Sequence, residues 1–354
     1  MPPSGMWIHG LGLMTPLGER PAAVAAAVRA GLSRRGESPC LNHNGDPMVV
    51  SQVPDDALLP LAAALADRPA AHRRLLRLAT RALQQAIAHL PDPPEIPLLL
   101  ALPESHPKLP PFAPGSLLAD LRIQCEVPLA LTSSALTYSG RAGALAALAD
   151  AFARPHDPRS PFVLVGGLDS SLDPELLAAL DHDRRVMAVG VRNGFAPGEG
   201  AAFLLLSQRQ ILPGSRARIH VSRPALGHEP GHRHGDAPLQ GDGLADALRE
   251  ALRGRPAASI RSVYAGLNGE QDGAREWGVA ALRNREALAD DLQLEHPASS
   301  LGDPGAAMAA TWLALIATGL ERGYCGGPAL VWCANDGPLR AAAIVEDRPA
   351  PETT

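Results

Sequence analysis

The stretch that decides the fold is GFAPGEGAAFLLLS, residues 194–207. Its first half spaces glycines closely, which permits tight turns and close approach of neighbouring backbones. Its second half is a continuous apolar run that predicts a buried strand. Glu199 lies between the two halves, so we expect it to pair inside the fold. The residues to which we assign this structural role are Gly194, Phe195, Gly198, Glu199 and Gly200.

Strands and helices alternate upstream of this stretch. MWIHGLGL at 6–13, VPLALTSS at 127–134 and FVLVGGLDS at 162–170 predict short buried strands. Between the last two, GRAGALAALADAFA at 140–153 predicts a helix that is apolar on every side and therefore buried. This order is typical of an α/β fold.

The same order begins again after residue 210. ARIHVSRPALG at 217–227 repeats the strand and Pro/Gly break of the N-terminus. A helix, a strand, an Ala-rich helix and a strand hairpin follow, at 243–253, 262–268, 304–322 and 328–346. We therefore expect two similar halves, 1–210 and 211–347, followed by a disordered tail at 348–354.

Composition narrows the classes of partner. The 354 residues are 46% hydrophobic and only 3% aromatic, with a net charge of −5, so neither nucleic acid nor an anionic membrane is expected as a partner. No cationic leader with an apolar segment opens the chain, and no apolar run reaches the ~18 residues of a membrane span. The four cysteines are too few and scattered for a disulfide scaffold. We expect a cytoplasmic protein.

Four blocks resemble the β-ketoacyl synthases, the condensing enzymes of fatty-acid and polyketide assembly. They are GLGLMTPLG at 10–18, GGLDSSLDPELLAALD with RNGFAPGEGAAFLLLS between 166 and 207, HGDAPLQGDGLADALREAL at 234–252, and SSLGDPGAAMAATWLALIATGL at 299–320. The resemblance implies the duplicated thiolase fold, five-layered α/β/α/β/α, with the helices at 140–153 and 304–322 between two sheets. It also implies a dimer, in which we expect the apolar strand 162–167 to be interfacial.

The resemblance also implies a catalytic set that this chain lacks. In the family, a cysteine at the N-terminus of a buried helix acts with two histidines. Here the aligned blocks place Thr137 at the cysteine (Tyr138 if the register slips by one), Asn268 at the first histidine and Gly302 at the second. We expect these three to converge on one pocket without a proton acceptor. The substrate-pocket residues implied are Thr137, Ser139, Asn268 and Asp303.

These losses favour a non-condensing protein. One reading is a partner or acyl-binding subunit, similar to the chain-length factors that pair with ketosynthases, as a homodimer or heterodimer and with an acyl carrier protein as a possible further partner. Residues 30–50 also resemble thiolase-like proteins found beside type VI secretion effector genes, which implies an accessory or adaptor role with a secretion-system protein. The alternative is an active acyltransferase that uses Thr137 or Ser139 on acyl carrier thioesters. No cofactor is expected.

Other clusters have structural explanations. His228, His232 and His234 have metal-ligand chemistry, but they lie in a Gly/Pro-rich stretch that favours a solvated loop. The hydroxyl residues at 133–139 are expected to cap the following helix, and Asp303 to cap the helix at 304–322. Cys125 and Cys333 lie in or beside apolar segments, so we expect them to pack as small hydrophobic residues.

Overall fold

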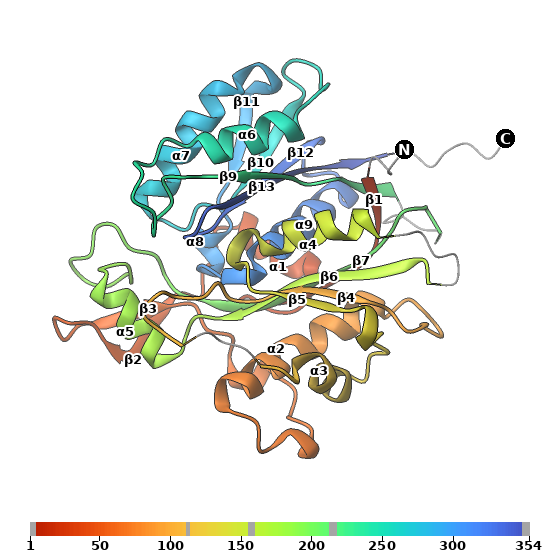
Figure 1. Cartoon of the computed structure of the whole chain (residues 1–354), viewed down its shortest axis with the longest axis vertical. Coiled ribbons are helices and arrows are strands. Elements are labelled where there is room, and N and C mark those ends of the chain that lie inside the picture. The colour runs from red at the N-terminus through yellow and green to blue at the C-terminus, as the bar shows by residue number, and fades with distance from the viewer. Residues whose placement is uncertain (1–4, 111–113, 155–159, 212–217, 349–354) are drawn as a thin grey trace.

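The computed structural model describes residues 5–110, 114–154, 160–211 and 218–348, in two sheets with helices between and outside them (Figure 1). The first sheet contains β1 (Gly5–Met14), β4 (Leu98–Ala101), β5 (Ala135–Thr137), β6 (Phe162–Ser170) and β7 (Glu199–Ser207). The second contains β8 (Ile219–Ser222), β9 (Ala225–His228), β10 (Ile260–Ala265), β11 (Leu288–Glu295), β12 (Ala329–Ala334) and β13 (Leu339–Asp347). β2 (Gly36–Leu41) and β3 (Pro47–Val50) form a separate hairpin.

The two sheets repeat one topology. The first runs β5-β4-β6-β7-β1, and the second runs β11-β10-β12-β13 and then β8 and β9, which both pair with β13. In the first sheet β5, β4 and β6 are parallel, and β7 is antiparallel to its neighbours β6 and β1. In the second sheet β11, β10 and β12 are parallel, and β13 is antiparallel to its neighbours β12 and β8. A short pairing of β1 with β8 connects the sheets. The expected duplication is therefore confirmed.

The helices complete five layers. α1 (Pro21–Arg29), α4 (Gly143–Ala153) and α9 (Met308–Glu321) lie between the sheets. α2 (Ala70–Ile87) and α3 (Leu117–Cys125) cover the outer face of the first sheet, and α6 (Asp242–Ala251) and α7 (Gln271–Arg283) that of the second. α5 (Pro174–His182) follows β6, and α8 (Ala298–Leu301) follows β11. The α/β/α/β/α prediction is confirmed.

The central layer explains the all-round apolar helices. Every residue of α9 from Met308 to Leu320 is buried, because both sheets pack against this helix. Its start also presses closely on β6: a Cβ atom at Gly167 would lie 1.9 Å from the carbonyl oxygen of Ala306, so only glycine fits there. This contact fixes the start of the central helix beside the end of β6.

Two local predictions were wrong. No strand forms at 127–134, because the hydroxyl groups of Ser133 and Ser134 both donate to the carbonyl of Ala130 in a 3-10 turn, and β5 begins one residue later. The segment 162–167 lies in β6, which pairs with both β4 and β7 and cannot extend a sheet across an interface. Along the sheet path of the described chain, β5 and β11 are the end strands.

The division at 210/211 adjoins residues 212–217, which lie outside the described residues, and it stays a prediction. The predicted tail also lies outside them, except for Arg348. Among the helices of the described ranges, none combines the length and apolarity needed to cross a membrane.

Candidate functional site

Hydrogen bonds to Glu199 hold the 194–200 segment at the end of β6. This carboxylate is fully buried and accepts hydrogen bonds from the backbone N–H of Val53 (2.8 Å), the hydroxyl of Ser170 (2.8 Å) and the guanidinium of Arg74 (Nε, 3.0 Å). Gly198 donates its N–H to the carbonyl of Asp303 at 2.9 Å. The segment thus holds the turn before α9 against the first sheet.

Thr137 ends β5, three residues before the helical turn that starts at Gly140. Its hydroxyl donates to the carbonyl of Leu100 (3.5 Å) rather than to Asn268 or Asp303. Ser139 lies immediately before the helical turn, and its buried Oγ has no hydrogen-bond partner among the described residues. Neither hydroxyl therefore contacts a group that would act as a general base.

A residue from the second half of the chain caps the helical turn that starts at Gly140. Asn335, just after β12, accepts a hydrogen bond from the N–H of Ala142 (2.8 Å) and donates to the carbonyl of Ser139 (2.5 Å). The prediction that the hydroxyl residues at 133–139 cap the helix was wrong, because the free amide is already satisfied by this amide oxygen.

Asn268 and the turn at 302–303 do meet. Asn268 Nδ2 donates to Asp303 Oδ2 (2.9 Å) and to Glu270 Oε2 (3.1 Å). Gly302 has φ +70°, and a Cβ there would lie 2.5 Å from the Cβ of Ser51, so this position contributes backbone alone. The side chain that enters the site is Asp303, which also accepts from the N–H of Gly305 (3.0 Å) at the 3-10 turn before α9. The prediction that Asp303 caps the helix at 304–322 was wrong, because α9 begins at Met308 without a side-chain cap.

Three arginines face three carboxylates around this point. We call this set the ion-pair cluster: Arg141, Arg185, Arg233, Glu270, Asp303 and Asp336. Arg185 binds both oxygens of Glu270 (2.8 Å each) and both oxygens of Asp336 (2.6 and 3.0 Å). Arg141 bridges Asp303 (2.7 Å) and Asp336 (3.0 Å). The formal charges therefore balance within the set.

Burial makes this pairing obligatory. Arg185 is 3% exposed, Glu270 6% and Asp303 2%. Burial alone would raise the pKa of Asp336, but Arg141 and Arg185 outweigh it and hold that pKa well below the usual range. The pKa of Glu270 is lowered in the same way, against burial, by Arg185. Both carboxylates are hydrogen-bonded and have lowered pKa values, so both are weak bases at neutral pH.

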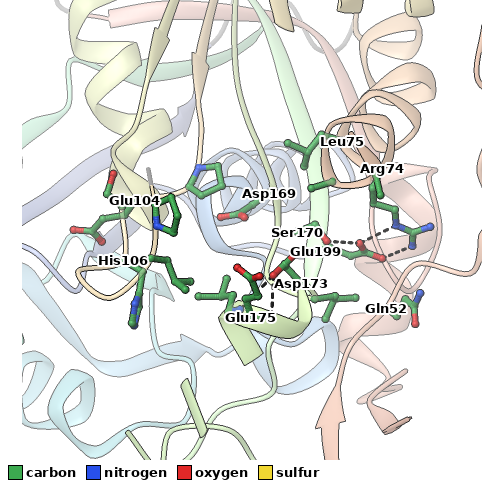
Figure 2. Close-up of a pocket in the computed structure, with 18 residues that line it drawn as sticks. Gln52, Arg74, Leu75, Glu104, His106, Asp169, Ser170, Asp173, Glu175 and Glu199 are labelled. Carbon is green, nitrogen blue, oxygen red and sulfur yellow. Dashed lines mark hydrogen bonds and ion pairs between the residues drawn. The ribbon is translucent and has the colours of Figure 1, made fainter. Parts of the chain in front are cut away.

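A cavity of about 560 Å³ lies beside the cluster, between α2, α5 and the loop after β4 (Figure 2). A smaller one of about 80 Å³ shares Glu104, His106 and Asp169 with it and reaches Gly140 and Arg141 at the start of the α4 region. Sequence reasoning missed Asp169. Its signal was an acidic residue at the end of the apolar run FVLVGGLDS, where β6 had to be buried.

The remaining candidates do not form a centre. Among the described residues, no group of three or more His, Cys, Asp or Glu side chains is placed to hold a metal ion. His228 is exposed at the end of β9, and the His234 ring contacts that of His106 edge-on, with the ring centroids 6.5 Å apart. Cys125 is buried, and burial raises the pKa of its thiol to about 12. Cys333 is also buried and has a raised pKa.

No protein-family model matches the sequence, and no curated protein is detectably similar to it. Solved structures are similar in fold. A ketosynthase in complex with its chain length factor from Xenorhabdus doucetiae has TM-score 0.75 and 17% identity, covering 97% of this chain and 98% of the other. The ishigamide ketosynthase/chain length factor has TM-score 0.70 and 17% identity, covering 98% and 100%. A β-ketoacyl synthase from Burkholderia phymatum has TM-score 0.70 and 15% identity, again covering 98% and 100%. The chain therefore has the ketosynthase-like, duplicated thiolase fold.

Proposed function

We propose that this chain is a non-condensing, ketosynthase-like partner subunit. The observation that carries the proposal is the ion-pair cluster, where the aligned blocks that hold Asn268 and Asp303 meet, whereas the hydroxyl of Thr137 bonds elsewhere. Asn268 and Asp303 come from the blocks in which the resemblance expects histidines, and both are committed to the cluster. The likeness to structures of ketosynthases with chain length factors supports a partner role on the same fold.

The chemistry of the cluster opposes condensation. Decarboxylation of a malonyl thioester develops negative charge on the thioester oxygen, which donors or cations must stabilise. Here the side chain at 303 is a carboxylate, and the amide N–H groups of Asn268 are already donated to Asp303 and Glu270. The nearby arginine Arg141 is paired as well. These side chains therefore offer the developing charge no free hydrogen-bond donor and no unpaired cation.

The first test is therefore enzymatic. We expect malonyl-pantetheine to be decarboxylated at the background rate, and an acyl-pantetheine probe to leave no covalent adduct detectable by mass spectrometry. The matched variants are Thr137→Ala and Ser139→Ala, which remove the two candidate nucleophiles and should leave both readouts unchanged. A rate above background, or an adduct, that either variant abolishes would overturn the proposal and favour an acyltransferase.

The partner surface we propose is the free edge of β5. This strand ends the first sheet in the described chain, and Ala135 within it and Tyr138 just after it are exposed. An unpaired strand edge is a template for pairing with another chain. The partner is then a second copy of this chain or a ketosynthase-like subunit. The link of residues 30–50 to secretion-system proteins stays a prediction that co-purification with neighbouring gene products would test.

Ala135→Arg is the sharp change at this edge, because a charged side chain at an exposed strand edge opposes strand pairing. We expect this substitution to raise the dissociation constant of the dimer at least tenfold, whether the dimer is a homodimer or forms with a co-expressed partner. Light scattering measures the change. Ala30→Arg, at another exposed alanine that follows α1, is the control and should have no effect. An unchanged dimer in Ala135→Arg would exclude this edge.

A further inference from the structure

The 560 Å³ cavity has an apolar wall and an acidic end. Four leucines line its wall: Leu75 of α2, Leu109 of the loop after β4, Leu172 before α5 and Leu176 within α5. Its volume falls in the range of small-molecule pockets. Neither Thr137 nor Asn268 lines it, so an argument about its occupant is independent of the proposed partner function.

Asp169 is the polar group at the inner end. It is 4% exposed, and Figure 2 shows its carboxyl group near the centre of the lining, between Glu104 on one side and Ser170 with Glu199 on the other. Asp169 Oδ2 accepts a hydrogen bond from the N–H of Ala306 (2.7 Å), at the start of the helical turn before α9. Asp169 Oδ1 has no hydrogen-bond partner among the described residues.

The backbone holds this carboxyl group in place. Gly305 has φ +53°, and a Cβ there would lie 2.0 Å from Asp169 Oδ2. Because residue 305 has no side chain, the carboxyl group of Asp169 can occupy this space. A buried acceptor left without a donor costs free energy, so one that is kept in a preformed pocket indicates a ligand that supplies the donor.

Three other carboxylates of the pocket already have partners, and the fourth, Glu175, is exposed to solvent. Glu199 is bound by Arg74, Val53 and Ser170, and Asp173 caps α5 by accepting from the N–H groups of Glu175 and Leu176. Glu104, in turn, accepts from the N–H groups of Asp336 (3.2 Å) and Gly337 (2.8 Å). Among the buried lining carboxylates of the described chain, the free oxygen is that of Asp169.

The charge of the lining selects the class of ligand. The described lining holds carboxyl groups at 104, 169, 173, 175 and 199 against the single guanidinium of Arg74, which is itself paired with Glu199. Burial lowers the pKa of His106, so this ring is neutral at pH 7. An anionic ligand would be repelled here, whereas a cation would be attracted.

We propose that this pocket binds a small organic cation, in which an ammonium group donates to Asp169 Oδ1 and an apolar body packs along Leu75, Leu109, Leu172 and Leu176. The ammonium supplies both the missing donor and the opposite charge. The apolar body removes the leucine wall from water.

The test uses three probes that share one apolar chain: hexylammonium, hexanol and hexanoate. Isothermal titration calorimetry on the full-length protein at pH 8 should show hexylammonium binding at least tenfold more tightly than hexanol, and no binding of hexanoate. Asp169→Asn keeps the shape of the side chain, and it should lower the affinity for hexylammonium at least tenfold while leaving that for hexanol unchanged.

Glu175→Gln is the matched control, because it removes an exposed carboxylate at the same pocket and should change the hexylammonium affinity less than threefold. Equal affinity for the three probes would overturn the proposal. So would an effect of Glu175→Gln as large as that of Asp169→Asn, since it would show that general acidity rather than the Asp169 anchor attracts the cation. Neither result would affect the malonyl-pantetheine assay, so the two proposals fail separately.

Discussion

Replacement of Arg185 by methionine is expected to lower the free energy of unfolding by about 3–5 kcal/mol. Arg185 is 3% exposed and donates four hydrogen bonds to Glu270 and Asp336. Methionine fills much of the same volume but leaves both carboxylates with less compensation in a buried site. Urea denaturation followed by circular dichroism measures the loss.

The charge balance of the cluster provides the controls. Arg185→Met combined with Asp336→Asn leaves two arginines facing two carboxylates, so part of the lost stability should return. Arg261→Met removes an exposed arginine paired with exposed Asp291 and should change stability by less than about 1 kcal/mol. A loss below about 1 kcal/mol in Arg185→Met would show that the cluster does not depend on this residue.

The sequence predicted the architecture well because the layers follow from local patterns. The apolar runs at β6 and β7 and the all-round apolar helices α4 and α9 require burial on both faces, which the five-layer arrangement provides. Short segments were predicted less well. At 127–134, two serine hydroxyls that bond to one backbone carbonyl prevented the strand that the apolar pattern favours.

The ion-pair cluster could not be predicted in the same way. Arg141, Arg185 and Asp336 lie far apart in the sequence and in different chain segments, and no spacing rule relates them. Alignment placed Gly302 at a reactive position, but the steric limit set by Ser51 leaves the adjacent Asp303 as the side chain that enters the site. Burial and partner geometry decide such details, and both require the tertiary structure.

The second large effect concerns Asp169 and pH. Burial, with a further contribution from the charge of Asp303, raises the pKa of Asp169 from 3.8 to about 7, against the hydrogen bond from the N–H of Ala306 and the charge of Arg141. A carboxyl group with a raised folded-state pKa binds its proton more tightly in the folded than in the unfolded state. The stability that this binding contributes is therefore present at acid pH and is lost as pH rises from about 4 to about 7.

Asp169→Asn removes this titration, so its free energy of unfolding relative to the wild type should rise by about 2–4 kcal/mol between pH 4.5 and pH 8 and then level off. Urea denaturation at several pH values measures the difference. Leu176→Met, a change without charge in the same pocket, should differ from the wild type by a constant amount. If the unfolding free energies of Asp169→Asn and the wild type differed by the same amount at every pH, the pKa of Asp169 would not be raised in the folded protein.

The same measurement links stability to the proposed ligand. A ligand that binds the folded state stabilises it according to its concentration and affinity. Saturating hexylammonium at pH 8 should therefore raise the unfolding free energy of the wild type and narrow its difference from Asp169→Asn, which lacks the anionic anchor. An equal gain in both proteins would place the cation elsewhere. At pH 8 the ionised Asp169 thus destabilises the folded protein, and an ammonium group is the partner that would offset that cost.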